Sequence, residues 1–391
     1  MSSKKARRYR RFCILVGVIM VAIVSILGLG QLQRQKQAKK VVQNQKAQHV
    51  KQPHKQISSK YQSIKSVPGI PPTDALGQKI KTTLTSINYS GTALIVKNGR
   101  PIFHQAYGYA DQDQKKLNTT DSLFQIASVM KNMTAILVMN EVRAGRLSLN
   151  QHIDVFYPQL PRASQITVLQ LLNMSTGYRQ TNSATTSMSA DDYINYDVNH
   201  VLDDGYTSWK YRAINYSILV GIIQKTSGKS YQTLFNDYFI KKHHYQFKDY
   251  QAFLASDART HGYDAKDNHV YADSALMFER EVGTGNLALT DSQFYRYLVD
   301  EMTGQLIQPD LFKQMLQPAA GSDFSGGLYW QRFANRYYLH GNIMGYEPTV
   351  YTSYDAKNMV ILLSNHNSDS SNAPIPRLNQ KTAETIYQMI Q

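Results

Sequence analysis

The chain has 391 residues, enough for one large or two ordinary domains, and its formal net charge of +15 first suggests a nucleic-acid partner. The charge is concentrated in residues 1–66, which contain 15 Lys and Arg residues and no Asp or Glu, so the rest of the chain has 28 charged residues of each sign. A formally neutral folded part implies no basic face that could follow a phosphate backbone, and we therefore set nucleic acid aside.

The first 29 residues have the pattern of a membrane anchor. A basic tail over residues 1–11 precedes residues 12–29, an uncharged run rich in Ile, Val and Leu that is close to the roughly 20 residues a membrane helix needs. The flanking positive charges favour the inner side of the membrane, and no A-x-A-like cleavage site follows the run. We expect an uncleaved, single-pass cell-membrane anchor with the C-terminal bulk outside; a cleaved signal peptide is the competing interpretation.

Residues 30–66 are predicted to be a disordered spacer, because they are rich in Gln and Lys and poor in aromatic and acidic residues. The single cysteine, Cys13, lies in the apolar run before this spacer. The external part therefore has no disulfide, which is typical of a bacterial surface protein that depends on its own core.

Residues 67–391 are predicted to form one domain with helices in the middle and strands near both ends. Strands are expected over 92–96, 101–109, 326–330, 336–340, 349–354 and 359–364, and helices over 74–87, 128–142, 166–177, 213–226 and 378–390. The polar stretch 178–204 is expected to be loop with short helical pieces. This order indicates a sheet built from both ends of the domain with a helical insertion, and a cleft between two lobes.

The helix over 128–142 carries the strongest chemical signal. Ser128 and Lys131 are three positions apart on one helical face, which is close enough for the amine to reach the hydroxyl. A serine at a helix N-terminus also lies where unpaired N–H groups and the macrodipole favour a developing anion. This is the arrangement of an S-x-x-K nucleophile, which needs no histidine base. The pattern alone is weak, since Ser2 and Lys5 also match it, and Ser128 could instead be an N-cap beside a solvated lysine.

The surrounding motifs carry a resemblance to a known family. They are Leu123-Phe-Gln-Ile-Ala-Ser128-Val-Met-Lys131, Gly145-Arg-Leu-Ser-Leu149, Ile166-Thr-Val-Leu-Gln-Leu-Leu172 with Ser175-Thr-Gly177, Tyr211 ahead of Asn215-Tyr216-Ser-Ile-Leu-Val-Gly221, and Gly327-Leu-Tyr-Trp330. Their order and spacing resemble the serine β-lactamase and penicillin-binding-protein superfamily, particularly its class C and low-molecular-weight carboxypeptidase or esterase branch. The resemblance implies a two-lobed, β-lactamase/transpeptidase-like fold, α/β in one lobe and all-α in the other, with the nucleophile at their junction.

The resemblance also implies roles for three catalytic residues. Ser128 would attack a carbonyl carbon to form an acyl-enzyme, Lys131 would take its proton, and Tyr211 would relay a proton between nucleophile and leaving group. Whether Lys131 or Tyr211 is the base is left open. Among metal motifs, H-E-x-x-H and C-x-x-C do not occur, and we expect neither a metal nor a cofactor.

The rest of the implied site comes from two further segments. We take Leu339-His340-Gly341-Asn342 as the third family motif, which is usually Lys-Thr-Gly or His-x-Gly, and His340 as its catalytic candidate; a packed strand-end histidine is the alternative. The oxyanion would be held by the Ser128 N–H and by one near Asn342. Asn215, Gly341 and Asn342 complete the implied substrate-binding and oxyanion group.

Two departures from the family pattern bear on the substrate. The second motif, usually Tyr-x-Asn, is Tyr211-Arg212-Ala213, and it lacks the carboxamide that normally contacts peptide or β-lactam substrates. The third motif is about one residue shorter than usual. A site without the amide-reading Asn suits an ester better than a peptide, because an ester has the better leaving group.

These observations lead to a ranked expectation. The first is a membrane-anchored, extracellular D-alanyl esterase of a Gram-positive-like bacterium, acting on D-alanylated lipoteichoic or wall teichoic acid. The second is a D,D-carboxypeptidase or similar hydrolase acting on the stem peptide of peptidoglycan. The third, from another class, is a catalytically degenerate module that only binds wall polymer.

Overall fold

The structure, a computed structural model, describes residues 66–368 and 377–391. The predicted basic tail and anchor, and all but the last residue of the predicted spacer, lie outside these ranges. In the described ranges no helix has both the length and the apolar character needed to cross a membrane.

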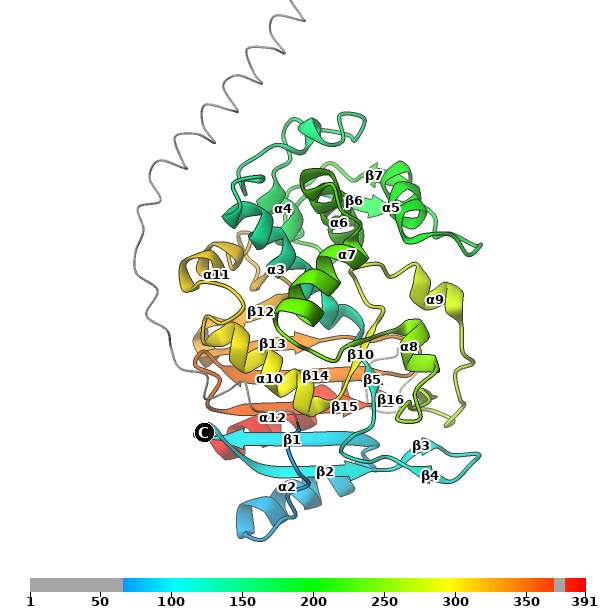
Figure 1. Ribbon diagram of the computed structural model, residues 1–391. Helices are drawn as coiled ribbons and strands as arrows, with labels where there is room; N and C mark the ends of the chain where they lie inside the picture. Colours follow the sequence, from blue (N-terminus) through cyan, green and yellow to red (C-terminus); the bar gives the residue numbers. More distant parts are fainter. Residues whose placement is uncertain (1–65, 369–376) are drawn as a thin grey trace, which may run out of the picture. The chain divides into compact units, whose positions relative to one another are not determined.

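A seven-stranded antiparallel sheet forms the centre of the domain (Figure 1). Its strands, in spatial order, are β11 (Phe324–Ser325), β12 (Leu328–Gln331), β13 (Arg336–His340), β14 (Glu347–Ser353), β15 (Met359–Ser364), β1 (Gly91–Lys97) and β2 (Arg100–Tyr107). The two ends of the domain meet where β15 pairs with β1, with Gly91 opposite Ser364 and Val96 opposite Met359. This confirms a sheet built from both ends of the domain.

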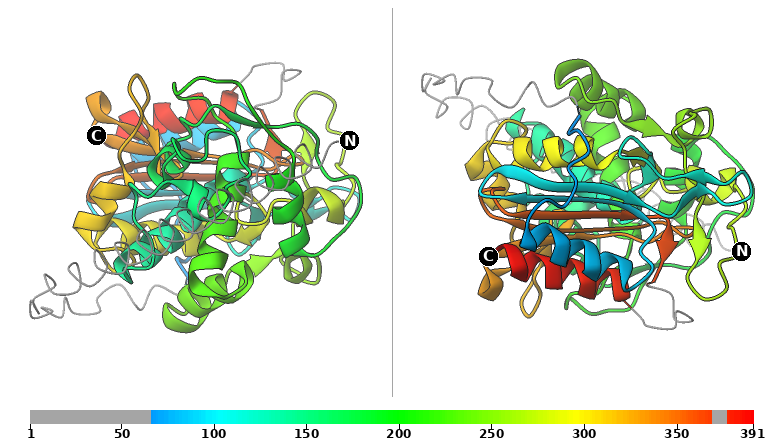
Figure 2. Two further views of the ribbon diagram at one scale, coloured as in Figure 1. Left: turned by 90° about the horizontal axis from the view of Figure 1, so that it is seen from above. Right: turned by 90° about the horizontal axis from the view of Figure 1, so that it is seen from below.

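Side chains alternate between the two faces of this sheet, and both faces are buried. Ala93 and Ile95 of β1 pack on one face, whereas Leu94 and Val96 pack on the other. The first face is covered by α2 (Ala75–Thr85) and α12 (Leu378–Ile390), which lie side by side beneath the sheet in the right view of Figure 2. The two terminal helices thus close one side of the core.

The other face of the sheet contacts the inserted helices; in Figure 1 most of them lie above the sheet, and α10 crosses in front of it. The longer helices are α3 (Met130–Arg143), α5 (Ala190–Asn199), α6 (Ile214–Ser227), α10 (Asp291–Met302) and α11 (Pro309–Met315). Shorter pieces are η1 (Ala127–Val129), η2 (Ile153–Val155), α4 (Val168–Leu172), α7 (Tyr231–Phe235), η3 (Asn236–Lys242), α8 (Tyr250–Leu254), α9 (Ala275–Glu279) and η4 (Arg332–Ala334). Three small sheets have two strands each: β3 (Tyr109–Asp111) pairs with β4 (Lys116–Leu117), β6 (Tyr178–Gln180) with β7 (Val201–Asp203), and β16 (His366–Asn367) with β9 (Tyr263–Asp264). A three-stranded sheet has β10 (Leu287–Leu289) between β5 (Phe124–Gln125) and β8 (Lys248–Asp249).

Two predicted segments differ from the structure in detail. The helix expected over 166–177 is only α4, and the chain leaves it through Met174, whose backbone φ is +55°. The stretch 178–204, expected to be loop with short helical pieces, contains the helix α5 and also the paired strands β6 and β7, which were not expected. The N-cap of α5 is Ser189, whose hydroxyl accepts a hydrogen bond from Asp192 N.

Candidate active site

Ser128 lies in a tight turn between β5, a strand of the small three-stranded sheet, and the largely buried helix α3. It belongs to η1, which continues directly into α3. The chain approaches this turn along β5, and Ile126 N donates to Leu287 O at 2.8 Å. The preceding residue, Ala127, is buried and has a φ of +46°, a left-handed conformation that costs a non-glycine residue roughly 1–3 kcal/mol. Such strain is typical of functional sites, and here it fixes the direction in which Ser128 projects.

The Lys131 side chain contacts Ser128 directly. Its Nζ lies 3.0 Å from Ser128 Oγ and donates a second hydrogen bond, also of 3.0 Å, to Thr284 O. Only 1 % of Lys131 is exposed, whereas Ser128 is partly exposed. A neutral amine in this position could accept the proton of the hydroxyl, so the pair has the geometry of an S-x-x-K nucleophile.

Tyr211 lies beside the same amine. The centroid of its ring is 5.6 Å from Lys131 Nζ, and its ring packs edge-on against Phe324 at 5.7 Å between centroids. The loop that carries it is held by Met174, whose carbonyl oxygen accepts from Lys210 N at 3.1 Å and whose sulfur accepts from Arg212 N at 3.3 Å. The structure therefore brings Ser128 and Lys131, from the start of α3, together with Tyr211, from the loop before α6.

Asn215 is placed differently from its expected role at the substrate. Its side chain is buried, donates through Nδ2 to Arg212 O at 2.9 Å, and accepts through Oδ1 from Thr176 Oγ1 at 2.7 Å. Both ends of the carboxamide are thus used to fix the loop that carries Tyr211. Ala213 is exposed at the start of α6, so the third position of the second motif offers a substrate no polar side-chain group.

Gly341 lies directly against the nucleophile turn. A β-carbon placed on it would lie 2.8 Å from Ile126 O and 2.9 Å from Ser128 N, so no larger residue fits without displacing the turn. The Gly341 N–H is engaged in the sheet with Pro348 O at 3.1 Å. The next residue, Asn342, is exposed, and its Oδ1 accepts from Asn367 Nδ2 at 2.7 Å. The end of β13 therefore adjoins Ser128 N, the region in which the two oxyanion donors were predicted.

His340 does not point toward this group, which differs from the role expected for it. Its Nε2 lies 2.9 Å from Gln380 Nε2 of α12 and 3.4 Å from Glu347 Oε1, and its ring stacks over Tyr338 at 6.1 Å. Because residues alternate along a strand, Gly341 and His340 face opposite sides of the sheet. Leu339 is the residue of β13 that shares a face with Gly341, and this register could not be read from the shortened motif.

Sequence reasoning missed a buried polar group behind Lys131. Asn132 Nδ2 donates to Glu301 Oε1 at 2.9 Å and to Gly326 O at 3.0 Å, and Tyr297 OH donates to Asn132 Oδ1 at 2.5 Å. Burial raises the pKa of Glu301 to about 8. A β-carbon on Gly327, whose φ is +80°, would lie 2.2 Å from Asn132 N. The consecutive glycines Gly326 and Gly327 before β12 were the sequence signal for this contact, because a turn without side chains lets the chain approach the start of α3.

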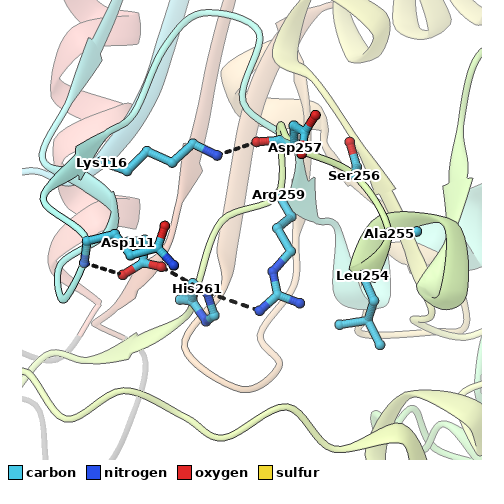
Figure 3. A pocket seen from close by; sticks show the side chains of 9 residues that line it. Asp111, Lys116, Leu254, Ala255, Ser256, Asp257, Arg259 and His261 are labelled. Atoms are coloured by element: carbon cyan, nitrogen blue, oxygen red, sulfur yellow. Dashed lines mark hydrogen bonds and ion pairs between the residues drawn. The ribbon is translucent and has the colours of Figure 1, made fainter.

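A separate polar pocket of about 300 Å³ lies between β4 and the segment 254–261 (Figure 3). Two of its cationic side chains have partners: the Lys116 ammonium donates to Asp257 O, while Arg259 Nη2 lies 2.9 Å from Asp273 Oδ2 and 3.1 Å from His261 Nε2. In the part of the chain that the structure describes, no group of three or more His, Cys, Asp or Glu side chains could hold a metal ion.

Comparisons with known proteins agree with this architecture. The family model described as Beta-lactamase matches residues 78–384, and the chain therefore belongs to the beta-lactamase family. The protein named "Putative penicillin-binding protein PbpX" of Bacillus subtilis (strain 168) is 25% identical over 316 residues, which are 80% of this chain and 78% of PbpX. Teichoic acid D-alanine hydrolase of Staphylococcus aureus is 24% identical over 299 residues, covering 74% of this chain and 73% of that protein.

Solved structures show the same fold. The crystal structure of FmtA from Staphylococcus aureus superimposes with a TM-score of 0.71 at 20% identity, covering 83% of this chain and 93% of FmtA. D-amino acid amidase from Ochrobactrum anthropi SV3, complexed with L-phenylalanine amide, gives a TM-score of 0.68 at 19% identity over 81% of this chain and 98% of the amidase. These likenesses establish the β-lactamase-like α/β fold that the motifs predicted.

Proposed function

We propose that this protein is a serine hydrolase that removes D-alanine from D-alanyl esters of teichoic acid through an acyl-Ser128 intermediate. The observation that carries the proposal is the contact of Lys131 Nζ with Ser128 Oγ beside Tyr211, in a site whose second motif ends in Ala213. Such a site retains a nucleophile and a base but lacks the carboxamide expected for an amide substrate. The name of the teichoic acid D-alanine hydrolase supports the same substrate class.

In the proposed reaction, Lys131 takes the hydroxyl proton while Ser128 Oγ bonds to the ester carbonyl carbon. The oxyanion that forms faces the Ser128 N–H and the backbone after Gly341. The bond to the polymer oxygen then breaks, and that oxygen leaves as a hydroxyl with a proton relayed through Tyr211. Water attacks the D-alanyl ester of Ser128 with the same base, D-alanine leaves, and the serine recovers its proton.

The face of β13 toward Ser128 favours an ester over a peptide with a free C-terminus. A D,D-carboxypeptidase must bind the terminal carboxylate of its substrate, for which a cation beside the nucleophile is suited. The residue that precedes Gly341 by two on the same face is Leu339, which is fully buried and apolar.

We also propose, from the basic tail and apolar run of residues 1–29, that the enzyme is anchored in the cell membrane with this domain outside.

The test is D-alanine release from D-alanylated lipoteichoic acid by the full-length protein in detergent. We expect Ser128→Ala to lower release by about 10⁴-fold or more, as for other enzymes that lose a nucleophile. The matched control is Ser86→Ala, which changes an exposed serine at the end of α2 on the far side of the sheet. A D-Ala-D-Ala muropeptide is assayed in parallel. Release from the muropeptide alone would favour the carboxypeptidase, and no release by folded protein from either substrate would favour a binding module.

A further inference from the structure

A glutamate adjoins the nucleophile turn from the segment 281–285, which joins α9 to β10. This segment supplies Thr284 O, the second acceptor of Lys131 Nζ. Its Gly285 packs on the residue before the nucleophile: a β-carbon placed there would lie 3.4 Å from the Ala127 carbonyl carbon and 3.5 Å from Glu281 Oε2. Gly285 therefore lies between Ala127 and the Glu281 carboxylate, which places that carboxylate near the nucleophile turn.

The orientation of this carboxylate is fixed by its own segment. Thr284 Oγ1 donates to Glu281 Oε2 at 2.6 Å, and the N–H groups of Thr284 and Gly285 both donate to Glu281 O at 3.0 Å. Glu281 is partly exposed, and across residues 66–368 and 377–391 none of the ion pairs includes it. A positioned carboxylate without a cationic partner can accept one from a ligand.

A second carboxylate, that of Asp197, adds negative charge close to Glu281. Asp197 of α5 is buried, with Oδ1 accepting from Gln180 Nε2 at 2.6 Å. Burial raises the pKa of Asp197 to about 6; the hydrogen bond from Ser217 opposes the shift and the charge of Glu281 adds to it. Arg280 is close enough to act on Asp197 in the opposite direction, but it forms no ion pair with Glu281 in the described segments.

The proposed substrate carries a positive charge that the Glu281 carboxylate could bind. A D-alanyl ester has an α-ammonium one carbon away from the carbonyl that Ser128 attacks, so the ammonium must lie within a few ångströms of the nucleophile turn. Ala213, on the second motif, has no polar group for it. We infer that Glu281 binds the α-ammonium of the acyl donor and makes the site selective for aminoacyl esters over uncharged acyl esters. This inference rests on the proposed esterase function and names its specificity residue.

The experiment compares two esters with the same leaving group, one of D-alanine and one of D-lactate, which has a hydroxyl in place of the ammonium. Glu281→Gln is expected to lower kcat/KM for the D-alanyl ester by about 10- to 100-fold, mainly through KM, because a hydrogen-bonded charge pair is lost. The D-lactyl ester should change by less than about 3-fold, since it has no charge to lose. The matched control is Glu279→Gln, two residues earlier, where the carboxylate accepts from Ser187 Oγ.

The outcomes separate this inference from the proposed function. Equal losses on both esters would overturn ammonium recognition, because they would show that Glu281 acts only through Thr284 and Lys131. If the wild type hydrolyses neither ester, the esterase function fails, and binding of D-alanine methyl ester to the Ser128→Ala variant decides the inference instead. Binding there that weakens with Glu281→Gln upholds it, and binding that does not respond overturns it.

Discussion

Two polar groups of side chains lie on opposite faces of the sheet near the end of β13, and they differ in how fully they are bonded. The Ser–Lys–Tyr cluster (Ser128, Lys131 and Tyr211) has few internal bonds: Ser128 Oγ contacts only Lys131 Nζ among the hydrogen bonds of the described residues. The Glu347 network (His340, Glu347, Ser368, Asn379 and Gln380) is nearly saturated. Glu347 is fully buried, and its Oε2 accepts from Ser368 N at 2.6 Å, Ser368 Oγ at 2.9 Å and Asn379 Nδ2 at 2.9 Å.

This difference separates groups suited to structure from groups suited to chemistry. A buried carboxylate that accepts several hydrogen bonds fixes the elements that carry its donors, here β14, the end of β16 and α12. A partly exposed hydroxyl with a single amine partner retains capacity for a substrate. The spacing of Ser128 and Lys131 stands out in the sequence, whereas the role of Glu347 is visible only through its partners in the structure.

The largest effect that tests the comparison is expected from Lys131→Met. Removing the amine should lower kcat for ester hydrolysis by roughly 10³-fold, since the Ser128 hydroxyl loses its contacting base. The free energy of unfolding should stay within about 1 kcal/mol of wild type, because a buried amine is replaced by an apolar chain of similar length. Both are measured on the same preparation, with Lys241→Met, at a lysine side chain that is 72% exposed, as control. A large loss of stability with little loss of kcat would place Lys131 with the structural group instead.

Glu301 is a buried acid behind the Ser–Lys–Tyr cluster, and its Oε1 accepts a hydrogen bond from Asn132. Because the pKa of Glu301 is raised to about 8 by burial, the folded protein keeps a proton that the unfolded chain releases near pH 4 to 5. The free energy of unfolding should therefore fall with rising pH by roughly 1 kcal/mol per pH unit from about pH 5 to 8 on account of this group. In Glu301→Gln, where the amide oxygen can still accept from Asn132, that contribution should vanish.

Urea unfolding of the wild type and Glu301→Gln at pH 5, 6, 7 and 8 measures this difference. Glu384→Gln is the matched control, since that carboxylate is 42% exposed on α12. Parallel pH profiles for the wild type and Glu301→Gln would contradict a protonated Glu301.

The sequence predicted the sheet and the Ser–Lys–Tyr cluster for different reasons. The strands near both ends of the domain are bounded by turn residues and contain alternating or continuous apolar runs. These runs are visible in the sequence because both faces of the sheet are buried. Ser128 and Lys131 are local in sequence, so helical spacing alone brings them together. Tyr211 required the family resemblance, since its contact with Lys131 spans 80 positions of the chain.

The remaining site residues depended on information that spacing does not contain. The position of Asn215 resembles that of a substrate-binding residue, but its partners Thr176 and Arg212 use both ends of its amide. Glu281 lies near the nucleophile turn because its segment packs on Ala127 through Gly285, a tertiary contact that residue spacing does not show. Assigning His340 to a face of the sheet required the register of β13, and a shift of one residue inverts that assignment.

The smallest effect, and the sharpest test of that register, is expected from His340→Gln. The side chain bonds to Gln380 and Glu347 on the α12 face, so its replacement should lower the free energy of unfolding by about 1 kcal/mol. It should change kcat/KM for the D-alanyl ester by less than about 3-fold, because Gly341, not His340, faces Ser128. His152→Gln, at an exposed position before η2, is the control. A loss of 100-fold or more in kcat/KM with unchanged stability would mean that the ring acts at the nucleophile after all, and that the two polar groups communicate through the end of β13.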